Sequence, residues 1–215
     1  MSRNEAVVIE TYKGHKIEIF QEEDGSCCDP RANDNLGTMA CFHNRYKLGD
    51  KTEMKSSMFG NWEEMKDYIV KTLKAVVVLP IYMYDHSGQT IATTPFSCRW
   101  DSGQIGFIFV TREKAMEEYS AKRITAELKK KIEGILEAEV KEYDTWIRGC
   151  VYYFNIENEE SGESVDTCGG YITDDTDELL AECKAIVDHI EANKPQVTLI
   201  DIIETKLENN LTFES

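Results

Sequence analysis

The chain has 215 residues, 41% of them hydrophobic and 30% charged, so it has enough apolar material for a packed core and does not have the composition of a disordered chain. Forty acidic against 24 basic side chains give a formal net charge of −16, which argues against sequence-tolerant nucleic-acid binding. No apolar run approaches the roughly 20 residues of a membrane helix, and residues 1–10 do not have the pattern of a signal peptide. We therefore expect a cytoplasmic protein of one domain, with no membrane association.

The seven cysteines do not have the pattern of a disulfide framework. Their number is odd, two of them are adjacent, and none has Cys-x-x-Cys spacing. A reduced, cytoplasmic setting is expected. Four of the cysteines are expected to act as small hydrophobic side chains rather than as nucleophiles: Cys41, Cys98, Cys150 and Cys183.

Acidic residues are concentrated in the C-terminal part of the chain. Residues 1–154 hold 24 acidic and 21 basic side chains, whereas residues 155–215 hold 16 acidic and 3 basic ones. Such an asymmetry indicates either a solvated surface that keeps the protein soluble or a docking face for a basic groove on a partner. Both interpretations are open at this point.

The N-terminal segments have the pattern of β-strands. Residues 6–11 and 15–21 are rich in alternating β-branched residues around a short turn, which predicts a hairpin. Residues 22–37 are polar and form a long loop, and long loops in compact domains are often functional. An apolar run follows at 38–43.

Helical and strand signals alternate in the middle of the chain. Asn61 is placed to cap a helix over 62–74, and the next ten residues, 75–84, are the most apolar of the chain and predict a buried strand. Pro80 requires an irregularity or an edge in that strand. Two further strands are expected at 89–94 and 104–111, as neighbours in the same sheet.

The C-terminal third combines helices and strands. Helical periodicity runs from 116 to 147, with Thr125 as the point where a second helix begins. Strands are expected at 149–157 and 165–173, and a strand or a short helix at 197–203. Between them a helix is expected, which Asp174, Asp175 or Thr176 can cap and which Asn193 and Pro195 stop.

These elements define a fold class. About six or seven strands and three or four helices, without regular alternation, indicate an α+β fold with a mixed or mostly antiparallel sheet. We interpret residues 1–215 as a single domain with a strongly acidic C-terminal part at 155–215.

Three polar loops next to apolar strands are candidate site segments: Asp34 to Asp50, Tyr84 to Gly88, and Pro95 to Gly103. If they converge, two imidazoles and two carboxylates offer ligands for Zn, Mn or Fe, although their spacing matches no known metal motif. Turn residues of this kind more often form hydrogen bonds within their own loops. The four side chains are His43, Asp85, His86 and Asp101.

A nucleophilic site could use the same loops. Cys98 or Ser87 would be the nucleophile, His86 the base and Asp101 the residue that orients it. The chain has no Gly-x-Ser-x-Gly, His-Glu-x-x-His, Gly-x-Gly-x-x-Gly or Walker A motif, so no cofactor is expected. Arg99-Trp100 and Arg45-Tyr46 are candidate anchors for a protein partner.

An ordered string of motifs in residues 28–111 resembles a group of uncharacterised small proteins of bacteriophages and other mobile elements. The motifs are Asp34-Asn35-Leu36-Gly37-Thr38-Met39, His43-Asn44-Arg45-Tyr46 with Leu48-Gly49-Asp50, Tyr84-Asp85-His86-Ser87-Gly88, and Pro95-Phe96-Ser97-Cys98 running to Trp100-Asp101-Ser102-Gly103-Gln104. The resemblance carries no established activity. It implies a context, because small acidic phage proteins often act on host machinery such as restriction and CRISPR systems, in some cases by presenting carboxylates where phosphates would bind.

The leading hypothesis is a non-catalytic inhibitor of a host nuclease or defence complex, of the anti-CRISPR or anti-restriction type. Its acidic C-terminal part would mimic nucleic-acid charge and would not bind nucleic acid itself. The first alternative is a small, metal-assisted hydrolase of a nucleotide or signalling molecule, with His43, Asp85, His86, Cys98 and Asp101 as its candidate residues. The second is a structural protein that acts as a homo-oligomer. Seven partner-binding residues are proposed for the inhibitor: Glu159, Glu160, Glu163, Asp174, Asp175, Asp177 and Glu178.

Overall fold

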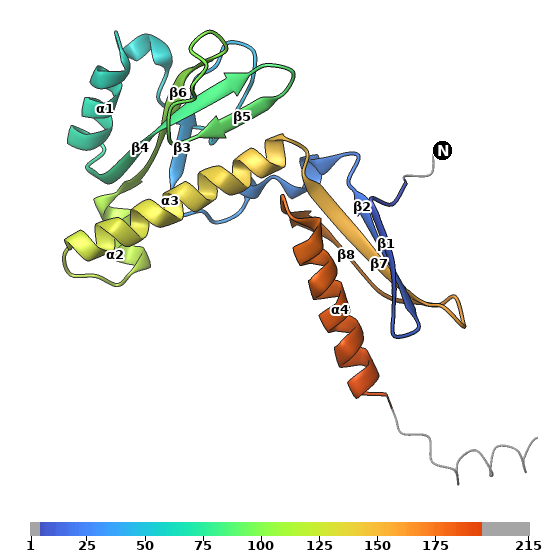
Figure 1. The fold of residues 1–215 in the computed structure, drawn as a ribbon. Coiled ribbons are helices and arrows are strands. Elements are labelled where there is room, and N and C mark those ends of the chain that lie inside the picture. Colours follow the sequence, from blue (N-terminus) through green and yellow to red (C-terminus); the bar gives the residue numbers. More distant parts are fainter. Residues whose placement is uncertain (1–4, 195–215) are drawn as a thin grey trace, which may run out of the picture.

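The first four-stranded sheet is built from the two ends of the described chain. A computed structural model describes residues 5–194, and in it β1 (Val8–Tyr12), β2 (His15–Gln21), β7 (Val151–Asn158) and β8 (Ser164–Ile172) form an antiparallel sheet in that order (Figure 1). Alternate residues of β2 and β7 point to one face, where Ile17, Ile19 and Phe154 are buried against α4 (Thr176–Ala192).

The second four-stranded sheet has helices on both faces. Its order is β3 (Thr38–Cys41), β6 (Ser102–Thr111), β4 (Ala75–Asp85) and β5 (Gln89–Ala92), all antiparallel. α1 (Trp62–Lys71) packs on one face against Phe107 and Phe109, and α3 (Ala126–Ile147) packs on the other against Ile108 and Val110. Because β6 is covered on both faces, it is apolar at successive positions rather than at alternate ones.

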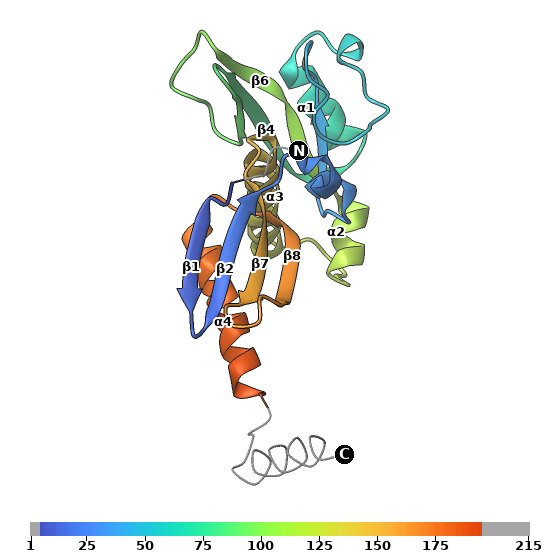
Figure 2. The same cartoon turned by 90° about the vertical axis from the view of Figure 1, so that its right-hand side faces the viewer.

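The two sheets lie in two lobes that α3 connects (Figure 2). The first lobe comprises residues 24–148, with two short 3-10 turns (Gly25–Cys28 and Pro30–Ala32), a third at Ser56–Met58, and α2 (Arg112–Glu118) before α3. The second lobe comprises residues 5–23 and 149–194. The α+β class with antiparallel strands is confirmed, and the strands are divided between two sheets.

Most element boundaries agree with the sequence expectations. The helical region after residue 111 is divided, and Thr125 caps α3 by accepting a hydrogen bond from Leu128 N at 3.1 Å. Pro80 is accommodated because β5 pairs only with Tyr82 to Asp85, so β4 is an edge at that point.

Two sequence expectations concern residues after 194. The segment 197–203 and the acidic residues beyond 194 lie outside the described residues. Within residues 5–194, no helix is long and apolar enough to cross a membrane.

Candidate functional site

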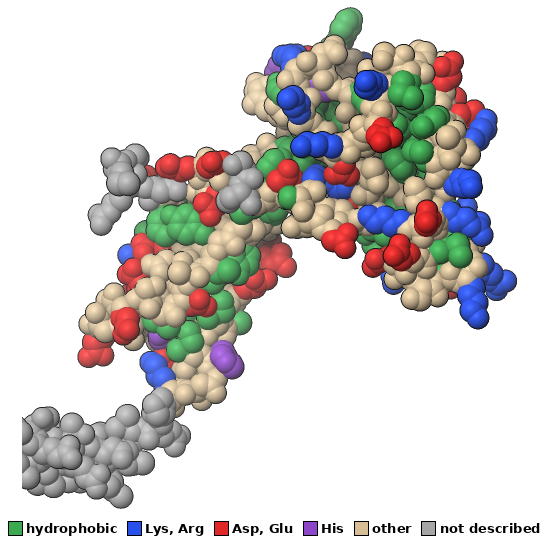
Figure 3. Space-filling view, turned by 180° about the vertical axis from the view of Figure 1, so that it is seen from behind, with side chains coloured by type: hydrophobic (Ala, Val, Ile, Leu, Met, Phe, Trp, Pro, Cys, Tyr) green, Lys and Arg blue, Asp and Glu red, His purple; other side chains and the backbone are tan. Residues whose placement is uncertain are grey.

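The two lobes carry very different charge. The first lobe holds 19 acidic and 18 basic residues, whereas the second lobe holds 17 acidic and only 4 basic ones. Figure 3 shows acidic side chains spread over the second lobe, and most basic side chains over the first. The excess begins before residue 155, because β1 and β2 belong to the same lobe and bring Glu5, Glu10, Glu18, Glu22 and Glu23 into it.

The seven predicted partner-binding acids lie in two groups rather than in one patch. Glu159, Glu160 and Glu163 are in the turn between β7 and β8, and the other four are at the start of α4. The nine residues of β8 separate the groups, which at about 3.3 Å per residue is roughly 30 Å. The two groups therefore lie at opposite ends of β8.

Two acids of the α4 group have structural roles. Asp175 caps α4 by accepting hydrogen bonds from the backbone of Asp177 and Glu178. Asp174 accepts from Arg148 Nη2 at 2.5 Å and from Thr145 Oγ1 at 3.2 Å. Partial burial acts to raise the pKa of Asp174, but the hydrogen bond and charge of Arg148 outweigh it and lower that pKa below 3.8.

The remaining acids are more available. Glu159 accepts a hydrogen bond from Thr11 Oγ1 at 2.7 Å. The carboxylates of four residues are exposed and have no hydrogen bond or ion pair within residues 5–194: Glu160, Glu163, Asp177 and Glu178.

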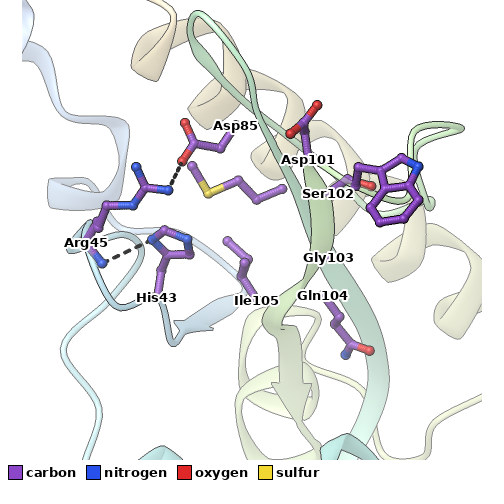
Figure 4. A pocket seen from close by; sticks show the side chains of 10 residues that line it. His43, Arg45, Asp85, Asp101, Ser102, Gly103, Gln104 and Ile105 are labelled. Atoms are coloured by element: carbon purple, nitrogen blue, oxygen red, sulfur yellow. Dashed lines mark hydrogen bonds and ion pairs between the residues drawn. The ribbon is translucent and has the colours of Figure 1, made fainter.

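The three candidate loops of the first lobe do converge. They enclose a pocket of about 300 Å³ whose polar lining includes His43 and Arg45 from the segment after β3, Asp85 at the end of β4, and Asp101 just before β6 (Figure 4). Trp100 also lines the pocket. The pocket exists because β4 and β6 pair and bring the ends of their loops together.

All five residues of the catalytic alternative lie at or next to this pocket. His43, Asp85 and Asp101 line it, and the other two contact Asp101: His86 Nδ1 lies 3.4 Å from its carboxylate and Cys98 Sγ lies 3.7 Å away. His43 stacks on Tyr46 with ring centroids 5.0 Å apart.

The arrangement differs from that of a nucleophilic triad. The Asp101 carboxylate lies between the Cys98 thiol and the His86 imidazole, whereas an activated thiol needs the imidazole as its direct neighbour. Elsewhere in the first lobe, burial raises the pKa of Cys41 to about 12, so this thiol is protonated at neutral pH. In the described part of the chain, no group of three or more His, Cys, Asp or Glu side chains is placed to hold a metal ion.

Sequence reasoning missed an ion-pair network around Arg31. Its guanidinium, 4% exposed, donates to both carboxylate oxygens of Asp50 at 2.9 and 2.7 Å, to Glu139 at 2.8 Å and to the Gly37 carbonyl at 2.7 Å. Glu139 in turn accepts from the backbone of Leu36 at 2.8 Å. No periodicity or motif marks these contacts, because Arg31 and Asp50 lie 19 positions apart and Arg31 and Glu139 lie 108 positions apart.

Comparison with known proteins gives no further guide. No protein-family model, no curated protein sequence and no solved structure matches the chain.

Proposed function

We propose that this protein is a non-catalytic binding protein whose second lobe docks on the basic surface of a partner, a nuclease or a nucleic-acid-binding defence complex. The segregation of charge carries the proposal. Nearly all of the excess negative charge of residues 5–194 belongs to one lobe, while the other lobe is close to neutral. A field of this kind steers a basic groove toward one end of the molecule.

The geometry supports charge-based docking more than catalysis. Four carboxylates of the second lobe are exposed without a described partner, so docking on a basic groove breaks no described ion pair. The pocket of the first lobe has neither a thiol–imidazole contact nor, within the described residues, a metal-ligand cluster. The resemblance to phage proteins gives this proposal its context, a bacterial defence system.

The experiment reverses only the available acids. In the test variant, Glu160, Glu163, Asp177 and Glu178 become Lys, and in a matched control four exposed acids of the first lobe change in the same way: Glu117, Glu118, Glu127 and Glu133. Each protein is used to capture partners from a bacterial lysate at low and moderate salt, and the retained proteins are identified by mass spectrometry.

We expect the wild type and the control to retain a nuclease or nucleic-acid-binding protein that duplex DNA displaces. The test variant should retain at least tenfold less of this partner. All three proteins should retain less of it at moderate than at low salt. Equal retention by the test variant, or a partner that DNA does not displace, would contradict the proposal.

A second candidate is a hydrolase of a nucleotide or signalling molecule. The convergence of His43, Asp85 and Asp101 on one pocket favours it. Elemental analysis of the purified protein, and the activity of the wild type and of His86→Ala, test this candidate. The absence of bound metal together with an activity that His86→Ala leaves intact would remove it.

A further inference from the structure

The first sheet is covered by a helix on one face, whereas the second sheet is covered on both. α4 packs on the face that holds Ile17, Ile19 and Phe154. In the described part of the chain no helix lies over the opposite face, which is turned toward the viewer in Figure 2. The alternation of side chains along paired strands assigns ten residues to this open face: Ile9, Thr11, Lys16, Glu18, Phe20, Tyr153, Asn155, Glu157, Thr167 and Gly169.

An apolar group lies on the part of the open face next to the first lobe. Phe20 and Tyr153 are opposite one another on the two central strands, and their rings stack with centroids 4.8 Å apart. On the edge strand, Ile9 is 60% exposed, and Val7, two residues earlier, is 50% exposed. Gly169 is the β8 partner of Tyr153, so no side chain of β8 stands directly opposite that ring. An exposed apolar group with a polar surround is typical of an interaction site.

Carboxylates provide that surround. Glu22 Oε1 lies 3.1 Å from the position of a Cβ at Gly169, beside the aromatic pair. At the edge strand, Glu159 accepts a hydrogen bond from Thr11 Oγ1 at 2.7 Å. Four glutamates and one lysine, which pairs with Glu18 at 2.7 Å, are the charged side chains placed on or beside the face: Glu18, Glu22, Glu157, Glu159 and Lys16. The apolar group therefore lies in a negative field.

These charges restrict what can cover the open face. A second copy of the chain would bring carboxylates against carboxylates, which is unfavourable. Aromatic side chains on an open sheet are suited to stacking with bases, but here the carboxylates would repel the phosphates of a nucleic acid. A protein surface with apolar side chains at its centre and Lys or Arg around them is complementary in both respects.

We infer that the open face is the surface by which the second lobe docks, and that it takes a basic, amphipathic helix of the partner protein. A helix can lay an apolar stripe on a sheet, as α4 does on the opposite face with Leu179, Cys183 and Val187. Its flanking Lys and Arg side chains would meet the surrounding glutamates. The inference rests on the proposed function, because it names the face and the partner element for the same docking.

The experiment uses a peptide in place of the unidentified partner. The probe is a blocked, fluorescent 15-residue peptide with Leu on one helical face and Lys on the other, and a shuffled peptide of the same composition has no apolar face. Binding to the full-length protein is measured by fluorescence anisotropy. In ¹³C-labelled protein, the Cδ1 methyl signal of Ile9, assigned by its loss in an Ile9→Ser variant, reports where the probe binds.

We expect the probe to bind with saturation and to shift the Ile9 signal, and the shuffled peptide to bind at least tenfold more weakly. Val7→Ser with Ile9→Ser should weaken probe binding at least fivefold. Glu22→Gln with Glu159→Gln should weaken it at least twofold and reduce its dependence on salt. The matched control is Val70→Ser, an exposed apolar residue on α1, which should change nothing.

The inference is overturned if the shuffled peptide binds as well as the probe, if the Val7 and Ile9 substitutions leave binding intact, or if the Ile9 signal does not move. Two other occupants of the face have their own signatures. At least fivefold tighter binding after Ile200→Ser with Ile203→Ser would assign the face to residues 195–215. A dimer in light scattering that the Val7 and Ile9 substitutions abolish would assign it to a second copy.

The two proposals fail separately. The four acids reversed in the capture experiment lie outside the open face, so loss of capture tests charge-based docking by the second lobe. Strong, charge-dependent capture together with no probe binding at Ile9 would remove only the open face as the docking surface.

Discussion

Two glycines and one carboxylate fix the course of the chain between Arg31 and Asp50. Gly49 has a φ of +70°, and a Cβ there would lie 2.5 Å from the Met39 carbonyl oxygen, so only glycine fits. Asp50 accepts hydrogen bonds from Arg31 and from the Met39 amide at 2.7 Å. A Cβ at Gly37 would lie 2.5 Å from Leu136. Gly37, Gly49 and Asp50 thus have identifiable roles in holding the backbone.

A pair of glycine substitutions tests this close packing. Gly37→Ala should lower the free energy of unfolding by about 1–3 kcal/mol, because the new methyl group meets Leu136 and Ile108 inside the core. Gly134→Ala, on the exposed face of α3 with open space around it, should raise the free energy of unfolding by about 0.5–1 kcal/mol. Urea unfolding followed by circular dichroism measures both changes. A stable Gly37→Ala variant would show that the loop is not held against α3.

At the scale of elements, α3 is the part on which the first lobe depends most. Ile132, Leu136 and Val140, each four residues from the next, are buried against the second sheet. Glu139 on the same helix binds the loop that precedes β3. Near its C-terminal end, Asp144 accepts from the Thr90 hydroxyl and the Ile91 amide of β5 at 2.6 and 2.7 Å.

The N-cap of α3 gives an element-scale prediction. Thr125→Ala removes the acceptor for Leu128 N and should lower the free energy of unfolding by about 1 kcal/mol. Thr125→Ser keeps the hydroxyl and should stay within about 0.5 kcal/mol of the wild type. Thermal and urea unfolding of the two variants measure these changes. An equal loss of unfolding free energy in both would assign the effect to the lost methyl group rather than to the hydroxyl.

Signals between residues close in sequence predicted the helices and strands well, but they did not predict which distant strands pair. Asn61 and Thr125 marked helix starts because a cap is a contact between residues three apart. The convergence of the candidate loops followed from the pairing of neighbouring strands β4 and β6. The pairing of β2 with β7 joins residues more than a hundred positions apart, and no sequence period reports it. For the same reason, the acidic residues around β1 and β2 could not be assigned to the same lobe as those that follow residue 155.

At the scale of the molecule, a short chain of polar contacts ties the lobes together. Arg148, at the end of α3, donates to Asp144 at 3.0 Å and to Asp174 at 2.5 Å, and Asp144 holds β5 while Asp174 precedes α4. Thr145, 4% exposed, adds a hydrogen bond to Asp174. One arginine therefore connects both lobes.

This junction should respond to acid. The lowered pKa of Asp174 means that its ion pair adds stability above about pH 3.8, and that this contribution is lost as the pH falls through the lower pKa of the folded state. We expect Asp174→Asn to be less stable than the wild type at pH 6, by less than about 1 kcal/mol because the pair is partly exposed. The difference should shrink below pH 3.8.

Urea unfolding of both proteins between pH 3 and pH 6 measures this difference. Glu160→Gln, in the β7–β8 turn, is the control and should show no such trend. A difference that stays constant with pH would remove the ion pair as its cause.

The sheet that joins the two ends of the described chain has a consequence for synthesis. β2 leaves the ribosome about 130 residues before its partner β7 begins, because the whole first lobe lies between Gln21 and Val151. At a rate of synthesis of roughly 5–20 residues per second, Ile17 and Ile19 of the β1–β2 hairpin stay uncovered for about 7–26 s before β7 is made. The first lobe can complete its own sheet during that interval, so the nascent chain presents a folded lobe and an unfinished hairpin that is open to chaperones until β7, β8 and α4 emerge.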